Sequence, residues 1–304
     1  MLKNIKVAEL DYLIFLGCVI PYRVVSYEIA SRHVLKKLGV NLIEMPEFNC
    51  CGLPIDSVNH DAMLTLAARN LSLAEQQGSD VLTLCPGCAG ALRKVNMTLQ
   101  NDKKLKERIN GYLKEVGLEF KGGKIKVRHI IQVLIEDIGL EKIKNTVVNP
   151  LSNLKVAAHN GCHVMRPTKY IGFDDPENPA LLKMLIEATG AECLDYMYET
   201  DCCGAPMVGV NDKIPLYLSG DKLRNIREVK AQALVTVCPL CHMMFDINQP
   251  RIEQLLSEKF ELPILHYPQL LGLSMGLKPK DLAIDELRVD ATKILKIIER
   301  VTSK

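Results

Sequence analysis

Ten of the eleven cysteines form a pattern that occurs twice along the 304-residue chain. In each copy a lone cysteine comes first, an adjacent Cys-Cys-Gly follows, and a Cys-x-x-Cys closes the set. The lone cysteine lies 32 residues before the first adjacent pair and 40 before the second, and the Cys-x-x-Cys begins 34 and 35 residues after the pairs. A scatter of buried thiols would not explain this repetition, so the pattern predicts a function for both sets. The first quintet is Cys18, Cys50, Cys51, Cys85 and Cys88, and the second quintet is Cys162, Cys202, Cys203, Cys238 and Cys241.

Clustered thiolates bind soft metals, and zinc, copper(I) and iron–sulfur clusters are the candidates. A structural zinc takes four ligands, usually from two Cys-x-x-Cys-like pairs. Each quintet offers five, and its adjacent cysteines aim poorly at one metal but can serve two metals of one cluster. An iron–sulfur cluster therefore fits best, with zinc as the alternative. The glycines and prolines beside the cysteines suit tight backbone wrapping with amides directed at sulfur, as at Gly52, Gly87, Gly204 and Pro239.

The composition describes a globular protein rather than a binder of nucleic acid or membranes. Hydrophobic residues make up 48% and charged residues 24%, and the formal net charge is +2, so we expect no nucleic acid partner. The longest apolar run, near 13–20, is well short of a membrane span, and 1–10 lacks the features of a secretory signal. We therefore expect a cytoplasmic protein, in which cysteines serve metal or redox chemistry more often than disulfides.

The elements that must position the quintets repeat in the same order. Strand, helix, strand, helix, strand in each part predicts an α/β fold of two pseudo-symmetric halves with parallel-strand cores and right-handed crossovers. We expect one Cys-Cys-Gly (CCG) domain at 1–145 and a second at 146–304. The first has strands near 12–16, 40–45 and 80–84 with helices near 25–37 and 58–77. The second has strands near 155–158, 191–196 and 233–237 with helices near 179–188 and 216–230, the last broken or delayed by Gly220.

Every cysteine of the quintets follows a predicted strand. Ligands of open α/β sheets bind beyond the carboxyl ends of the strands, so five thiols per half should converge at that edge. Cys193 stands outside the pattern, on the predicted strand 191–196, and is interpreted as a core residue. The Lys-rich stretch 101–124 between the halves is interpreted as a solvated helix and turn, with a docking face for an acidic partner as the alternative. The tail 278–304 is amphipathic and suits a surface helix on the body or on another subunit.

Four further residues are candidates for the reaction itself. His163 and His242 directly follow Cys162 and Cys241. Either they hydrogen-bond to sulfur or backbone, or they deliver protons to a reacting sulfur, because imidazole titrates near neutral pH. Arg166 and Lys169 follow soon after and could bind an anionic substrate. No dinucleotide or Walker motif is present, so we predict no tightly bound nucleotide or flavin in this chain.

The doubled cysteine pattern resembles the CCG (cysteine-rich domain) proteins, and among them the heterodisulfide reductase subunits of the HdrB type. The likeness runs over nearly the whole length. It includes FLGCVIP at 15–21, KVRHIIQVL at 126–134, HNGCHVMRP at 159–167, VCPLCHMMFD at 237–246 and LHYPQLLGLSMG at 265–276.

This resemblance implies two noncubane 4Fe-4S clusters, one on each quintet. It also implies reductive cleavage of the coenzyme M–coenzyme B disulfide between the clusters, by two one-electron steps. The implied partners are an HdrC-like subunit with cubane 4Fe-4S clusters and an HdrA-like flavin subunit. A larger electron-bifurcating complex with a hydrogenase or formate dehydrogenase is also implied.

Two positions depart from the family pattern. The segment 205–209, Ala-Pro-Met-Val-Gly, replaces a glycine-rich run, and Gly52 stands where proline is frequent. The alternative is therefore a paralogous CCG subunit. Such a subunit would act on another disulfide or sulfur carrier, or pass electrons in a quinone- or lactate-linked complex.

Overall fold

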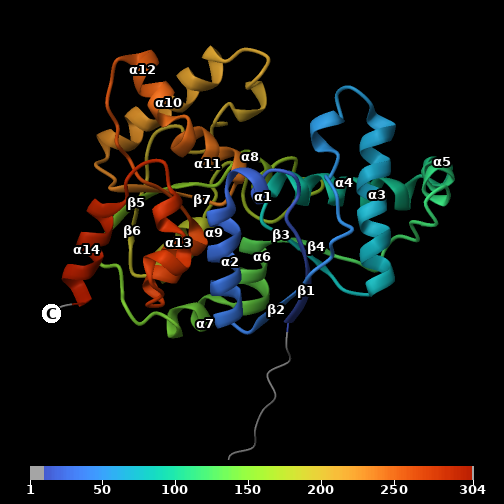
Figure 1. The fold of residues 1–304 in the computed structure, drawn as a ribbon, viewed down its shortest axis with the longest axis horizontal. Helices are drawn as coiled ribbons and strands as arrows, with labels where there is room; N and C mark the ends of the chain where they lie inside the picture. The colour runs from blue at the N-terminus through green and yellow to red at the C-terminus, as the bar shows by residue number, and fades with distance from the viewer. Residues whose placement is uncertain (1–9, 303–304) are drawn as a thin grey trace, which may run out of the picture.

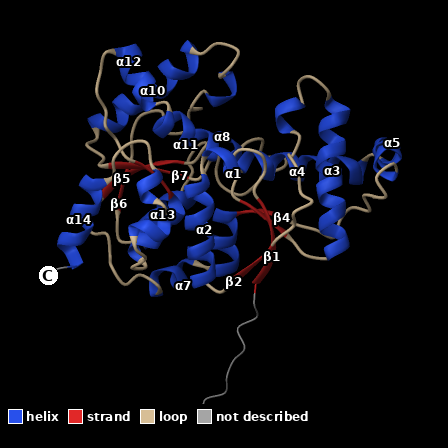
Figure 2. Cartoon of the chain, in the orientation of Figure 1, coloured by secondary structure: helices blue, strands red, loops and turns tan. Residues whose placement is uncertain are grey.

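The computed structural model describes residues 10–302. Two four-stranded sheets form two lobes, and helices cover both (Figures 1 and 2). The strand orders are β2-β1-β3-β4 and β6-β5-β7-β8, and every pairing is parallel. The prediction of two α/β halves of the same design is confirmed. The strands are β1 (Leu10–Phe15), β2 (Val40–Ile43), β3 (Val81–Thr83), β4 (Val127–His129), β5 (Lys155–His159), β6 (Glu192–Leu194), β7 (Ala233–Thr236) and β8 (Ile264–His266).

The helices also repeat in order between the two halves. Those of the first are α1 (Ile20–Arg23), α2 (Val25–Lys37), α3 (His60–Gln77), α4 (Pro86–Asn101), α5 (Lys103–Lys114), α6 (Ile130–Gln132) and α7 (Leu140–Asn145). Those of the second are α8 (Cys162–Met165), α9 (Leu181–Ala188), α10 (Lys213–Glu228), α11 (Pro239–His242), α12 (Gln249–Leu256), α13 (Tyr267–Ser274) and α14 (Thr292–Thr302). Short 3-10 turns η1 (Leu53–Ile55) and η3 (Ala205–Met207) follow the two CCG sequences, and η5 (Pro279–Leu282) and η6 (Ile284–Glu286) precede α14. Single π-helical turns, η2 (Val133–Ile138) and η4 (Met243–Ile247), extend α6 and α11.

Local signals explain where the helices around the cysteines begin and end. The side chain of Asn59 accepts a hydrogen bond from the amide of Ala62 and caps α3, and Gly78 ends α3 in a left-handed conformation. Helices α4 and α11 each begin inside a Cys-x-x-Cys, with proline as the first helical residue. The Cys-x-x-Cys sequences are therefore held at helix N-termini.

Two sequence expectations need correction. Helix α10 runs unbroken through Gly220. A Cβ at this position would lie 2.3 Å from Leu256 Cδ1, so the glycine permits close packing against α12. The polar stretch 101–124 does not separate the halves: it forms α5 and a loop, and the chain then adds β4 to the first sheet.

The two halves pack directly against each other. Helix α13 of the second half packs against α2 of the first, and one hydrophobic core contains residues of both (Figure 1). Ile294 and Ile298 of α14 are buried in that core, so the tail helix packs on the body of its own chain. A division at 145/146 falls between the two sheets, and the independence of the two domains stays a prediction.

Candidate metal centre

The cysteines of both quintets follow the carboxyl ends of strands. In the first half they come after β1, β2 and β3, and in the second after β5, β6 and β7. A cavity of about 570 Å³ lies at these ends and is lined by cysteines of both quintets. Its cysteines are Cys18, Cys51, Cys85 and Cys88 from one half and Cys162, Cys202, Cys203, Cys238 and Cys241 from the other. The expected convergence is therefore present, and the two sets face one space.

Within each quintet the thiols contact one another directly. Hydrogen bonds from Cys50 and then from Cys88 lower the pKa of Cys51, although burial opposes them. In the second half, hydrogen bonds from Cys162 and Cys203 lower the pKa of Cys202. A hydrogen bond with Cys241 also lowers the pKa of Cys238. At least one sulfur in each half is thus prepared to be a thiolate, the form that binds metal. All eleven cysteines are free thiols.

Glycines bring the backbone close to these sulfurs. A Cβ at Gly17 would lie 2.9 Å from Cys88 Sγ, and one at Gly161 would lie 3.5 Å from Cys241 Sγ; both glycines have positive φ. The amides of Gly52 and Gly204 lie 3.4 and 3.3 Å from the sulfurs of Cys50 and Cys202 and donate to them. Soft donors, backbone amides directed at sulfur and glycine-lined space fit an iron–sulfur cluster in each half.

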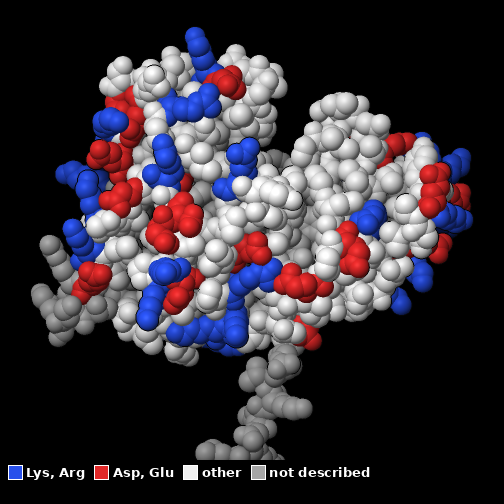
Figure 3. Space-filling model, in the orientation of Figure 1, with Lys and Arg blue, Asp and Glu red and all other residues white. Residues whose placement is uncertain are grey.

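The remaining wall of the cavity is largely apolar. It includes Leu16, Val19, Leu53, Val208 and Leu240. Figure 3 shows the hollow between the two lobes, where the visible side chains are mainly neither acidic nor basic. Such a wall suits an uncharged reacting group and keeps water away from it.

The four other predicted residues occupy different places. His163 lines the cavity, with Nδ1 3.4 Å from Cys162 Sγ. His242 is buried beside the cavity, with Nε2 3.5 Å from an Asp246 carboxylate oxygen. Arg166 donates a hydrogen bond to the Pro176 carbonyl, and neither it nor Lys169 is among the lining residues. The roles of these four in proton transfer and substrate binding stay predictions.

Cys193 lies apart from both quintets. It is buried in the hydrophobic core on β6, and burial raises the pKa of its thiol to about 12. An inert thiol in an apolar site matches the interpretation of this residue as core.

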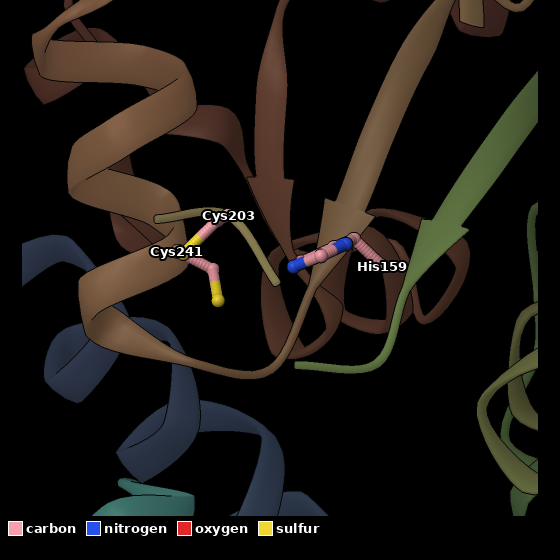
Figure 4. Close-up of side chains that lie close together, drawn as sticks. All are labelled: His159, Cys203 and Cys241. Atoms are coloured by element: carbon pink, nitrogen blue, oxygen red, sulfur yellow. The ribbon is translucent and has the colours of Figure 1, made fainter. Parts of the chain in front are cut away.

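Sequence reasoning missed two residues at the second quintet. A ring nitrogen of buried His159 lies within 4.8 Å of the sulfurs of Cys203 and Cys241, and Figure 4 shows the ring directed toward them. Among the described residues neither ring nitrogen has a hydrogen-bond partner. Buried Lys222 donates hydrogen bonds to the carbonyls of Tyr198 and Glu199, just before the second CCG. The position of His159, at the end of a predicted strand and three residues before Cys162, was the one signal for it.

Comparison with known proteins gives the family. The model of the CCG cysteine-rich domain matches twice, at residues 12–93 and 156–246. The chain belongs to the CCG family. It is 38% identical to the HdrB-type chain of the ferredoxin/F(420)H(2)-dependent CoB-CoM heterodisulfide reductase of Methanosarcina acetivorans, over 95% of this chain and 97% of that one. The predicted resemblance to the HdrB subunits of heterodisulfide reductase is confirmed.

This CCG chain is also similar to a subunit of a different enzyme and to a solved structure. It is 32% identical to the "8-methylmenaquinol:fumarate reductase membrane anchor subunit" of Wolinella succinogenes, over 93% of this chain and 99% of that one. A solved structure of a hypothetical protein from Helicobacter pylori has the same fold, with a TM-score of 0.74 and 16% identity over 92% of this chain and 52% of that one. Within residues 10–302 no helix is both long enough and apolar enough to cross a membrane.

Proposed function

We propose that this chain is the disulfide-cleaving subunit of a heterodisulfide reductase. The observation that carries the proposal is one cavity with nine of the ten quintet cysteines, from both halves, on its wall. A disulfide has two sulfur atoms, and a cavity with a cluster site from each half can bind one sulfur near each site.

The first quintet would hold one 4Fe-4S cluster and the second quintet another, both of the noncubane kind that five cysteines favour. When bound, the two clusters supply one electron each to the disulfide. The overall reaction is RS–SR′ + 2e⁻ + 2H⁺ → RSH + R′SH, and we assign RS–SR′ to the coenzyme M–coenzyme B disulfide. This assignment rests on the two Methanosarcina relatives, which are named as parts of CoB-CoM heterodisulfide reductases.

The chain's own residues contribute orientation, exclusion of water and protons. The apolar wall at Leu16, Val19 and Leu240 excludes water from the reacting sulfurs. Of the two candidate proton donors, His163 is the better placed, because it lines the cavity beside Cys162. The buried His242 would act through His163 or on the second cluster. Arg166 and Lys169, outside the lining, would meet the anionic ends of the substrate.

Electrons would reach this subunit from partners. An HdrC-like subunit with cubane 4Fe-4S clusters and an HdrA-like flavin subunit would supply them, in a cytoplasmic complex that could include a hydrogenase or formate dehydrogenase. The names of the relatives, which denote one subunit of a larger enzyme, support this assignment.

A second candidate is an electron-transfer subunit that does not cleave a disulfide. The relative from Wolinella succinogenes, named as a subunit of a fumarate reductase, favours it. In this case the cavity would accept no thiol or disulfide, and the clusters would only relay electrons.

Anaerobically purified protein tests the proposal. With an artificial one-electron donor it should reduce the heterodisulfide, and added coenzyme M should change the electron paramagnetic resonance (EPR) spectrum of the oxidised clusters. Full iron loading without either response would exclude disulfide cleavage and favour the relay.

A further inference from the structure

The two quintets have different surroundings at matching positions. Phe15 is the last residue of β1 and lies three residues before Cys18, whereas His159 is the last residue of β5 and lies three residues before Cys162. Both side chains are buried, at 0% and 1% exposure. At this position the first half therefore presents a phenyl ring, and the second presents a ring with nitrogen atoms near Cys203 and Cys241 (Figure 4).

A second exchange places a cation behind the second CCG. Asn70 and Lys222 each lie 19 residues after the second cysteine of their CCG, and both are buried. Asn70 binds the backbone of Asn49 and Cys50, and Lys222 binds the carbonyls of Tyr198 and Glu199, so each braces the segment that leads into its CCG. The bracing group is the neutral amide of Asn70 in the first half and the amino group of Lys222, a cation, in the second.

Lys222 is close enough to the second quintet to feel its charge. Burial lowers the pKa of Lys222 to about 8, while negative charge on Asp201 and then on Cys241 and Cys203 acts to raise it. The side chain is a cation at pH 7, and its hydrogen bonds go to backbone carbonyls. A buried cation of this kind is stabilised by nearby negative charge, which thiolates supply.

The residues that directly follow cysteines differ in the same direction. Val19 follows Cys18, whereas His163 follows Cys162, and Ala89 occupies the position of His242. The surroundings of the first quintet are thus apolar at positions where those of the second carry hydrogen-bonding groups.

We propose that His159 and Lys222 give the second cluster a higher reduction potential than the first, so that the two centres are inequivalent and the second is reduced first. Reduction adds one electron, and therefore one negative charge, to a cluster. A buried cation and hydrogen-bond donors near the sulfurs stabilise that charge and raise the potential. The inference rests on the clusters of the proposed function but not on the identity of the disulfide.

Two exchanges of charge act in the opposite sense. Asp201, directly before Cys202, stands where the first half has Asn49, but it is exposed and its charge acts on Lys222. The other exchange lies after the last cysteine of each quintet. Arg93 in the first half corresponds to Asp246 in the second, five residues after the last cysteine of each quintet. Arg93 donates to Val127, Ile171 and Gln132, and the charges that affect its pKa are those of Arg128 and Glu136 rather than of cysteines. The Asp246 carboxylate accepts the amides of Arg288 and Val289, which disperse its charge.

A redox titration of the iron-loaded protein at pH 7, with dithionite and mediators and followed by EPR, tests the inference. Wild-type protein should show two one-electron transitions. Lys222→Met removes the charge and keeps the length of the side chain. This substitution should lower the midpoint potential of the upper transition by about 59 mV and leave the lower transition unchanged. At a fixed potential, such a shift lowers the ratio of reduced to oxidised second cluster about tenfold. His159→Phe, which installs the first half's residue, should move the same transition downward.

Two controls separate charge from architecture. Lys222→Arg keeps the charge and should keep the upper transition near its wild-type potential. A role of Lys222 as a structural brace alone would not make the potential depend on this charge. Asn70→Met changes the matching brace without changing charge and should leave the upper transition in place. The iron content of each variant shows whether it has folded. If Lys222→Met loses its iron, the test is made with His159→Phe and Lys222→Arg.

Four results would overturn the inference: equal potentials in the wild type, no shift in iron-replete Lys222→Met, no shift in iron-replete His159→Phe, or a shift confined to the lower transition. Protein that binds no iron would contradict both this inference and the proposed function. Unequal potentials that respond as expected, without heterodisulfide cleavage, would uphold the inference and refute the proposed function.

Discussion

Tyr27 of the first half stacks on His266 of the second, with ring centroids 3.8 Å apart and planes 6° from parallel. The Tyr27 hydroxyl donates a hydrogen bond to the carbonyl of Val237, the residue before Cys238. Burial raises the pKa of Tyr27, and the thiols of Cys238 and Cys85, one from each quintet, add to the effect. Tyr27 therefore lies between the two sets of cysteines and fixes how the halves meet.

Removing that contact should destabilise the protein. Tyr27→Phe keeps the stack and loses the bond to Val237, at a cost of about 1 kcal/mol in the free energy of unfolding, and Tyr27→Ala should cost about 3–5 kcal/mol. Urea unfolding measures both. Tyr22→Ala is the control, because Tyr22 is 83% exposed and should change stability by less than about 0.5 kcal/mol. Equal effects at the two tyrosines would contradict this account of the contact between the halves.

Iron content should distinguish ligand cysteines from the core cysteine. Cys203→Ser should lose the iron of the second half, because the cluster proposed for the second quintet loses a ligand there. Cys193→Ser should keep the wild-type iron content, since Cys193 is buried in the hydrophobic core away from the cavity. Iron per chain by elemental analysis decides, and iron loss from the Cys193 variant would show that the ligand set is wrong.

Filling the cavity should block the substrate without disturbing the clusters. Val208 lines the cavity and Val210 does not, although both follow the second CCG and are exposed. Val208→Trp should lower kcat/KM for the heterodisulfide by about tenfold or more, equivalent to about 1.4 kcal/mol of transition-state binding. Val210→Trp should leave it near wild type. Steady-state kinetics at equal iron content make the comparison, and equal losses in both variants would argue against binding in this cavity.

A side chain at Gly220 should destabilise the packing between α10 and α12. Gly220→Ala places a methyl group against Leu256 and should cost about 1–3 kcal/mol through overpacking between α10 and α12. Gly111→Ala in α5 is the matched control, since nothing lies within 4 Å of its Cβ position, and it should stabilise the helix by up to about 1 kcal/mol. Urea midpoints measure both changes, and a neutral Gly220→Ala would mean that the two helices can separate.

Most of the fold was predictable because local periodicity and the cysteine repeat agree. The helix expected at 25–37 is α2, and the helix expected near 58–77 is α3, which spans His60–Gln77. The strand positions followed from short apolar runs, and the repeat then placed the cysteines at one edge of each sheet.

What was missed depends on long-range packing. The outer strands β4 and β8 are three residues long, too short to give a clear alternation, and become strands only by pairing with β3 and β7. Gly220 was interpreted as a break because its role as a packing glycine shows only when α12 is placed against it. His159 and Lys222 gave no metal-ligand spacing, and their proximity to the second quintet arises only in the folded chain, where β5 and α10 bring them near Cys203 and Cys241.

The central claim is that each quintet holds an iron–sulfur cluster, and metal analysis of anaerobically purified protein tests it most directly. The account predicts about eight iron and about eight acid-labile sulfide per chain, that is, about four of each in each of the two 4Fe-4S clusters. Zinc at one equivalent per quintet, or iron at about half the predicted content in the wild-type protein, would contradict it.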